Sequence, residues 1–534
     1  MRCATLVLLL CSHLAVAAEP AADLVLRGGA ILTGDAARPR AHAVAVRGGV
    51  IVAVGDDADV TKLVGAKTRV VELAGRTVVA ALTDAHAHLV GLGLGASEID
   101  LRGCGSADDC AHRVERDFDS GRGRRGQWVL GRGWDQNRFP DATFPTHRAL
   151  DKIVNPVFVE RVDGHAGWAN AAAMRLAHVD RATEDPPGGR IVRDAAGAPT
   201  GVFVDNAKAL IEHVIPPPTA AEVEAAILRA QELALAEGLT EVHEMGIGHD
   251  TVDAYRRLVA DGRLKLRVYA LAAADDAVTL LMHPPEAPRR LALFTLRGIK
   301  IYADGALGSR GAALLAPYSD DPQNRGLTLT AGDKIERAAR AAVKSGWQIA
   351  VHAIGDGANR AVLDAYQKAG AGPAQRFRIE HAQVVALDDI PRFAKLGIIA
   401  SMQPTHATSD SPWAEARLGK ERLRGAYAWR RMLDAGVTLA FGSDFPVEAV
   451  SVVAGLRAAV ERGGWTVGER LTLEEALRAF TTGAAFAAFE EAWRGSATPG
   501  MAADLTVFDG PPATLLRARV DATIVGGRVV YERR

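Results

Sequence analysis

Short apolar runs that end in polar residues recur through the middle of the chain. Eight such runs read as β-strands: 79–88, 240–244, 264–271, 298–304, 348–352, 376–381, 398–403 and 438–444. Segments with helical character, such as 220–237 with its Ala and Leu at helical spacing and 334–344, separate them. Alternating strands and helices favour a parallel sheet, and eight strands favour closure. The pattern therefore predicts an α/β fold, a (β/α)8 TIM barrel.

The two ends of the chain show a different pattern. Residues 22–80 alternate short β-rich runs with Gly and Asp turns, and the same style resumes after Pro499-Gly500. We therefore expect one small β-sandwich domain assembled from both termini, residues 19–80 plus 496–534. The barrel domain, residues 81–495, is then inserted between its two parts.

A long excess segment, residues 95–218, follows the first predicted barrel strand. It exceeds an ordinary connection between strand and helix, so we expect an insertion that lies over the barrel mouth as a lid subdomain. The segment holds a large share of the aromatic residues, and for any one of these rings a structural role is the simpler interpretation. They are Trp128, Trp134, Trp168, Phe139, Phe144 and Phe158.

Residues 1–18 predict export. Arg2 precedes an apolar stretch that is too short to cross a bilayer, and small residues mark a cleavage site near Ala17 or Ala18. We expect a signal peptide and a secreted or periplasmic protein without stable membrane insertion. The mature chain keeps Cys104 and Cys110, which form either a local disulfide or two free thiols.

Composition narrows the class of partner. The chain of 534 residues has 63 basic and 64 acidic residues and a net charge of -1, with 48% hydrophobic and 24% charged residues. This balance gives no electrostatic basis for binding nucleic acid or an anionic membrane. The expected partner is a small molecule, and the sequence leaves open whether the protein forms a homo-oligomer.

Candidate metal ligands stand near the ends of the predicted barrel strands. His86 and His88, two residues apart on a strand, point to the same side and suit one ion. His352 and His381 suit a second ion, and Asp444 is expected to bind metal and to act as the general base and acid. In TIM-barrel enzymes the catalytic residues gather at the carboxyl ends of the strands, so these side chains are expected to meet.

Such a set fits hydrolysis of an amide bond, which needs an activated water, a polarised carbonyl and a proton for the leaving nitrogen. A metal ion supplies the first two and a carboxylate moves the proton. Lys300 is the unusual member, because an ammonium cannot bind a cation. A lysine carbamylated by carbon dioxide presents two oxygens that can bridge two ions; the alternative is an uncarbamylated lysine in a mononuclear site.

The chain resembles the amidohydrolase superfamily, and within it the YtcJ-like group (amidohydrolase 3 domain) that includes N-substituted formamide deformylases. The likeness runs from about residue 22 to the end and rests on motifs near each predicted ligand: Asp84-Ala85-His86-Ala87-His88, Lys300-Ile301-Tyr302-Ala303-Asp304-Gly305, Val351-His352-Ala353-Ile354-Gly355-Asp356, Arg378-Ile379-Glu380-His381, Ser401-Met402-Gln403-Pro404-Thr405-His406 and Gly442-Ser443-Asp444. The resemblance implies a barrel, zinc or a similar divalent ion, two ions per chain being expected, and hydrolysis of a C–N bond. It also implies that residues 162–170 reach down to the site, which makes His165 and Trp168 candidate substrate contacts.

Two further substrate contacts are candidates. His243 either lines the pocket or supports it from behind, and Arg310 either clamps a substrate oxygen or fixes a loop through an ion pair. For His249 and His406 we expect surface or packing roles. The leading function is an exported metal-dependent amidohydrolase acting on a small amide. The alternatives are an esterase or lactonase using the same site and a non-catalytic binding protein on a degenerate barrel.

Overall fold

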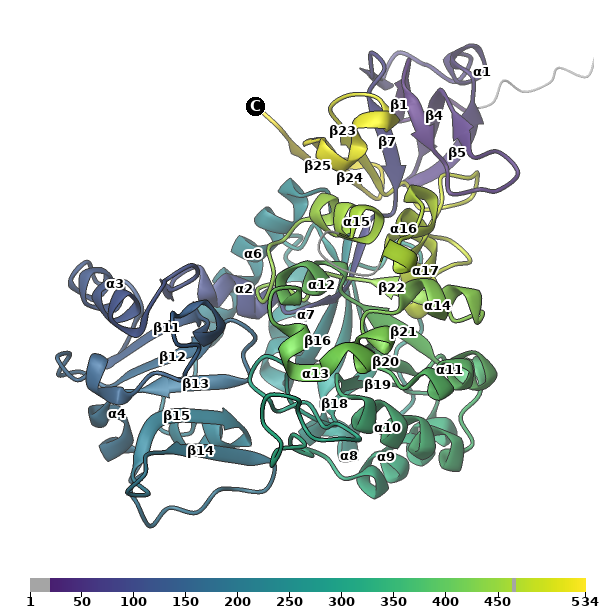
Figure 1. Ribbon diagram of the computed structural model, residues 1–534. Helices are drawn as coiled ribbons and strands as arrows, with labels where there is room; N and C mark the ends of the chain where they lie inside the picture. The colour runs from purple at the N-terminus through teal and green to yellow at the C-terminus, as the bar shows by residue number, and fades with distance from the viewer. Residues whose placement is uncertain (1–19, 463–466) are drawn as a thin grey trace, which may run out of the picture.

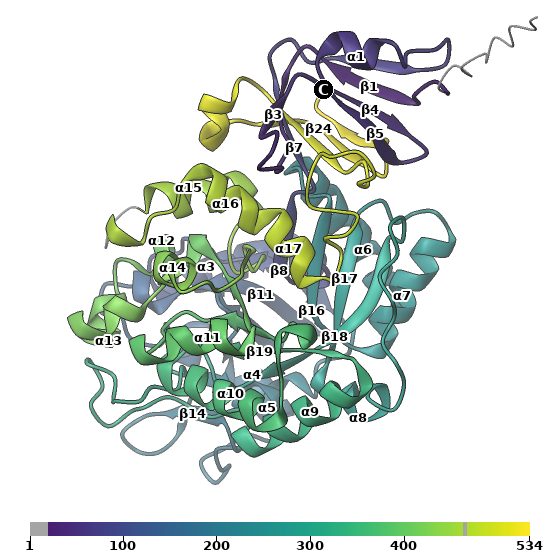
Figure 2. The ribbon, with the colours of Figure 1, turned by 90° about the vertical axis from the view of Figure 1, so that its right-hand side faces the viewer.

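The computed structural model describes residues 20–462 and 467–534, so the expected signal peptide lies outside the described residues. At its centre is an eight-stranded parallel sheet in the order β22-β21-β20-β19-β18-β17-β16-β8 (Figures 1 and 2). The strands are β8 (Thr83–Ala87), β16 (Glu241–Ile247), β17 (Arg267–Ala273), β18 (Phe294–Tyr302), β19 (Gln348–Ala353), β20 (Arg378–His381), β21 (Ile399–Met402) and β22 (Leu439–Phe441). Each of the eight predicted segments overlaps one of them.

The two ends of this strand order approach each other. Strands β22 and β8 are in contact, and the backbone N–H of Asp444, just beyond β22, donates to the carbonyl of His86 at 2.8 Å. The side chain of Asp84 adds a second link, because it accepts hydrogen bonds from the backbone N–H and the hydroxyl of Ser443. The sheet therefore nearly closes into a TIM-barrel-like structure, as the sequence predicts.

Helices surround this barrel. The predicted helix at 220–237 is α6 (Ala220–Ala236). At its start, the Thr219 hydroxyl accepts a hydrogen bond from the backbone N–H of Glu222, and the Glu222 carboxylate accepts one from the backbone N–H of Thr219. Gly238, in the left-handed conformation at φ +85°, follows its end. The predicted helix at 334–344 lies within α9 (Gly332–Ser345). The others around the barrel are α2 (Leu89–Gly95), α7 (His249–Ala260), α8 (Ala277–Leu280), α10 (Asp356–Ala369), α11 (Ile390–Leu396), α12 (Pro404–Asp410), α13 (Ala414–Arg422), α14 (Trp429–Asp434), α15 (Val452–Glu461), α16 (Leu473–Phe480) and α17 (Thr482–Ala487). Among the described helices, none is both long and apolar enough to cross a lipid bilayer.

The insertion after β8 forms a separate seven-stranded sheet beside the barrel (Figure 1). Its elements are β9 (Ile99–Asp100), α3 (Ala107–Asp119), β10 (Arg124–Arg125), β11 (Trp128–Trp134), β12 (Val157–Arg161), β13 (Ala166–Ala169), α4 (Ala171–Leu176), β14 (Gly189–Arg193), β15 (Pro199–Asp205) and α5 (Ala209–Glu212). Trp128, Trp134 and Trp168 are almost fully buried in its cores. Cys104 and Cys110 are joined by a disulfide, which decides between the two alternatives for these residues.

Both chain termini build a third part, where the purple and yellow segments of Figure 1 meet. A four-stranded sheet joins β5 (Val50–Gly55), β4 (Ala43–Arg47), β1 (Leu24–Arg27) and β6 (Arg69–Glu72), with α1 (Asp57–Thr61) beside it. A six-stranded sheet joins β25 (Arg528–Glu532), β24 (Val520–Val525), β23 (Leu505–Phe508), β7 (Thr77–Ala80), β2 (Ala30–Leu32) and β3 (Arg40–Ala41). The two sheets share one apolar core, which is what the expected β-sandwich requires, while the exact domain boundaries stay a prediction.

A buried ionic cluster joins this terminal part to the barrel, at the amino ends of the barrel strands. Asp504, just before β23, accepts from Arg267 on β17 at 2.7 Å and from Arg494 at 3.0 Å, and Arg494 also pairs with Glu241 on β16. All four side chains are at most 2% exposed. Burial opposes the charge of Asp504, but Arg267 and Arg494 hold its pKa below the ordinary value.

We predict that Asp504→Asn lowers the free energy of unfolding by about 3–5 kcal/mol, because it leaves two buried guanidinium groups without their shared carboxylate. Urea unfolding at pH 7 measures the loss. The matched control is Asp59→Asn, which breaks an exposed ion pair with Lys62 and is expected to lower the free energy of unfolding by less than about 1 kcal/mol. Since the pKa of Asp504 is lowered by folding, its contribution is present above the ordinary pKa of 3.8 and is lost as the pH falls below it. Equal losses in the two variants would contradict the prediction.

Candidate metal centre

A cavity of about 780 Å³ opens at the carboxyl ends of the barrel strands. It is lined by all the predicted metal ligands: His86, His88, Lys300, His352, His381 and Asp444. They come from β8 and the residue that follows it, from β18, β19 and β20, and from the segment after β22, which lie far apart in the sequence. The barrel therefore gathers these side chains where the strand pattern predicts.

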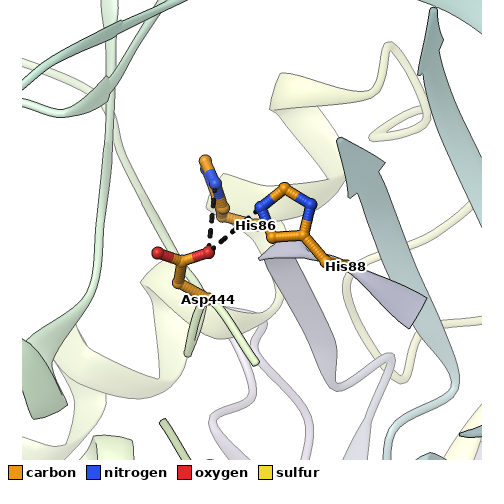
Figure 3. A group of neighbouring side chains, drawn as sticks. All are labelled: His86, His88 and Asp444. Carbon is orange, nitrogen blue, oxygen red and sulfur yellow. Dashed lines mark ion pairs between the residues drawn. The ribbon is translucent and has the colours of Figure 1, made fainter. Parts of the chain in front are cut away.

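His86, His88 and Asp444 form one compact group (Figure 3). Asp444 Oδ1 lies 3.5 Å from His86 Nε2 and 3.3 Å from His88 Nε2, and this buried oxygen has no hydrogen-bond partner among the described residues. Asp444 is held at φ +60°, in the left-handed region that non-glycine residues seldom adopt. Two imidazole nitrogens and a carboxylate oxygen, all facing one point, are the donor set of a divalent metal site.

Neighbouring groups orient these ligands. Glu380 Oε2 lies 2.6 Å from His86 Nδ1, and Arg378 holds Glu380 from the far side with a 2.7 Å hydrogen bond. A carboxylate behind a histidine fixes its orientation, so that Nε2 faces the cavity. Burial and the charge of Lys300 lower the pKa of His86 to about 4, which keeps it neutral and able to bind a cation.

Asp444 and His381 also carry charge states that suit ligation. Burial opposes ionisation of Asp444, but the surrounding histidines hold its pKa well below the ordinary value, so it is a carboxylate. Burial and neighbouring histidines lower the pKa of His381 well below its ordinary value. The Nδ1 of His381 lies 2.8 Å from Gln403 Oε1, which directs its Nε2 away from that side.

Lys300 lies in the same cluster. It is 1% exposed, with Nζ 3.4 Å from His86 Nε2 and 4.9 Å from the centre of the Tyr302 ring. Burial lowers the pKa of Lys300 to about 8. A lowered pKa leaves more of the amine neutral at pH 7, and the neutral amine is the form that reacts with carbon dioxide.

Known proteins resemble this chain in sequence and fold. A family model described as "Amidohydrolase family" matches residues 69–531. The chain belongs to the amidohydrolase family. This amidohydrolase is 33% identical to the putative amidohydrolase YtcJ of Bacillus subtilis, over 95% of this chain and 99% of YtcJ. It is 30% identical to the N-substituted formamide deformylase of Arthrobacter pascens, over 96% of this chain and 98% of that enzyme. A crystal structure of an uncharacterized metal-dependent hydrolase from Pyrococcus furiosus matches with a TM-score of 0.74 and 29% identity, over 92% of this chain and 99% of that one.

The insertion supplies the outer wall of the cavity of this amidohydrolase. His165 lines it, with Nδ1 2.6 Å from Asp205 Oδ1 and its ring centre 5.0 Å from that of His352. Lys208 lines it too, bonded to Glu160 at 2.6 Å. Antiparallel pairing of β13 with β15 places Asp205 beside His165, and this register between distant strands is why the sequence pattern did not indicate Asp205 or Lys208.

Three predicted substrate contacts lie away from the cavity of the amidohydrolase. Trp168 is 0% exposed in the insertion core, with its ring centre 6.1 Å from that of Trp134. Arg310 pairs with Asp320 at 3.0 Å, which corresponds to the loop-fixing alternative. His243 is 0% exposed, and its Nδ1 lies 2.9 Å from Arg378 Nη1, behind the ligands. Of the four candidates, the structure brings His165 to the site.

His406 is the residue whose position differs most from the expected surface or packing role. It lies in α12, and with His381 and Asp444 it forms a second group of ligand atoms within 4.8 Å of one another. His249, for which the same role was expected, is exposed and lies beside Asp253.

Proposed function

We propose that this amidohydrolase hydrolyses a C–N bond of amide type in a small molecule, through a metal-activated water, with Asp444 as general base and acid. The observation that carries the proposal is the convergence of the six ligand candidates on one cavity of about 780 Å³. A bound divalent ion lowers the pKa of water and polarises the substrate carbonyl. The proposed cofactor is two divalent ions per chain, zinc by preference, because imidazole and carboxylate donors suit zinc.

The residues then have distinct roles. His86, His88 and Asp444 would hold one ion, His352 and His381 would hold the other, and a carbamate on Lys300 would supply further oxygen ligands. The buried Oδ1 of Asp444 has no hydrogen-bond partner among the described residues. Asp444 takes a proton from the water molecule as the water oxygen adds to the carbonyl carbon of the substrate. It then delivers that proton to the nitrogen as the C–N bond breaks, which yields a carboxylic acid and an amine.

The substrate is proposed to be a small N-acyl compound, such as an N-formyl or N-acyl amine. Support comes from the relative named N-substituted formamide deformylase, which matches over 96% of this chain. The insertion is proposed to cover bound substrate, because His165 and Lys208 face the cavity from that side. His165, held by Asp205, is the proposed substrate contact on this wall.

Export to an oxidising compartment is also proposed. The disulfide between Cys104 and Cys110 supports it, because such bonds persist mainly outside the reducing cytosol. Mass spectrometry of protein recovered from the producing cells tests the proposal: a mature chain that begins after Ala17 or Ala18 is expected, and a cytosolic chain that keeps residues 1–18 would contradict it.

We predict that the purified protein holds about two divalent ions per chain and that chelation abolishes its amidase activity. Adding zinc back is expected to restore both. Elemental analysis gives the stoichiometry, and a library of N-acyl amines with matched esters and lactones gives the bond specificity. Full activity in metal-free protein would contradict the metal mechanism, and turnover of esters alone would assign the site to the esterase or lactonase alternative.

A further inference from the structure

Tyr302 is the last residue of strand β18 and lines the same cavity as the candidate metal ligands. It stands two positions after Lys300, so the two side chains point to the same side of the strand. Its ring centre lies 5.4 Å from that of His352 and 4.9 Å from Lys300 Nζ. The strand therefore places a phenol directly beside the centre of the proposed hydrolysis.

The hydroxyl of Tyr302 is not used by the protein itself. Tyr302 is half-buried, and its hydroxyl has no hydrogen-bond partner among residues 20–462 and 467–534. Two other tyrosines of the barrel donate such bonds: Tyr269 to Gln348 at 3.0 Å, and Tyr318 to the carbonyl of Ala312 at 2.8 Å. Since a buried tyrosine hydroxyl usually has a partner, the hydroxyl of Tyr302 is placed to bind a molecule in the cavity.

The end of strand β16 leaves the space beside this hydroxyl open. Gly246 forms a bulge there, because the pairing with β17 shifts between Met245 and Ile247. Gly246 has φ +73°, in the region that favours glycine, and a side-chain carbon added to it would lie 3.6 Å from the Tyr302 oxygen. Glycine supplies no such carbon, so the hydroxyl stays accessible from the cavity.

The cation on the insertion wall is placed differently from Tyr302. Lys208 Nζ bonds to Glu160 at 2.6 Å, to the carbonyl of Gly164 at 2.7 Å and to Glu212 at 3.1 Å. An ammonium has three donors, so these contacts leave Lys208 none for a substrate. Tyr302 keeps its proton at pH 7, as phenols do, and therefore has one O–H to donate.

We propose that Tyr302 is a catalytic residue, whose hydroxyl donates a hydrogen bond to the carbonyl oxygen of the substrate as negative charge develops there. The inference rests on the proposed function, because it adds a donor to the same hydrolysis. The hydrogen bond strengthens when the water oxygen adds to the carbonyl carbon and weakens again when the C–N bond breaks. The proton stays on Tyr302 throughout, so Asp444 remains the group that moves a proton. A donor aimed at developing charge stabilises the transition state more than the ground state.

Tyr302→Phe tests this, because it removes the oxygen and keeps the ring beside Lys300 and His352. The variant is expected to lower kcat by about 10²-fold, as loss of one such donor does, with little change in KM and with the wild-type metal content. The matched control is Tyr255→Phe, which removes a buried hydroxyl without a hydrogen-bond partner among the described residues, on α7 and away from the cavity. It is expected to keep the wild-type kcat.

Thioamide substrates give a second readout, which locates the contact at the carbonyl oxygen. Sulfur accepts hydrogen bonds more weakly than oxygen, so the ratio of the amide rate to the thioamide rate is expected to be smaller in Tyr302→Phe than in wild type. Any direct effect of metal on sulfur is common to both proteins. The inference is overturned if Tyr302→Phe with full metal content keeps the wild-type kcat, or if the two proteins give the same ratio. A wild-type protein that hydrolyses no N-acyl amine would instead contradict the proposed function itself.

Discussion

Asp444→Asn is expected to reduce kcat by about 10²–10⁴-fold while the protein keeps its fold. The neutral amide has no basic oxygen to take the proton from the attacking water, and losses of this size are typical when a general base is removed. A weaker effect on binding of a neutral amide substrate is expected, since the cavity walls formed by the insertion and by the other strand ends stay in place. Steady-state kinetics that separate kcat from KM measure the difference.

The loss in Asp444→Asn has two physical sources, because this residue also lies beside other candidate metal ligands. Metal analysis of the variant separates loss of ions from loss of the base. Asp253→Asn, at a half-exposed carboxylate beside His249, makes the same chemical change away from the cavity and is expected to leave kcat unchanged. Turnover of Asp444→Asn near the wild-type rate with full metal content would place the base elsewhere.

Lys300→Ala is expected to lower metal content and activity together, by at least about 100-fold in activity, since even residues behind a metal ligand contribute 10–100-fold. If a carbamate bridges two ions, short carboxylic acids are expected to restore part of the activity by filling the space of the missing side chain. The restored rate is measured as a function of acid concentration, with His249→Ala protein treated in parallel.

Lys300→Arg distinguishes the carbamate from a simple positive charge. Guanidinium keeps the charge but neither forms the carbamate nor binds a cation, so this variant is expected to be as inactive as Lys300→Ala and to gain nothing from added acid. An arginine variant with normal metal content and rate would show that Lys300 serves only as a buried cation beside His86.

Much of the barrel can be predicted from local pattern, because each strand carries its own apolar run and polar end. The ligands at strand ends follow from the same rule: His86, His352 and His381 lie within their strands, so the strand fixes their direction. For residues outside regular strands, the strand pattern does not predict where the side chain points. His406 lies in a helix after β21, so the direction of its side chain depends on how that helix is oriented relative to the barrel. The local hydrophobic pattern does not determine this orientation.

The insertion shows a second limit. Trp168 belongs to β13, and an alternating strand does not reveal which of its faces meets the barrel and which meets the insertion core. Asp205 reaches His165 only through pairing of β13 with β15, across about forty residues of chain. Such contacts depend on long-range register, which hydrophobic pattern leaves undetermined.

The small domain built from both termini has a consequence for the order in which the chain folds. Strand β7 pairs on one edge with β2, which is made before it, and on the other edge with β23, which begins at Leu505 and is made only after the whole barrel. Until β23 leaves the ribosome, β7 presents an open edge, a template on which other chains can assemble. A strand made late therefore protects the edge of one made much earlier, and a truncation after residue 500 is expected to promote aggregation even where the barrel itself is complete.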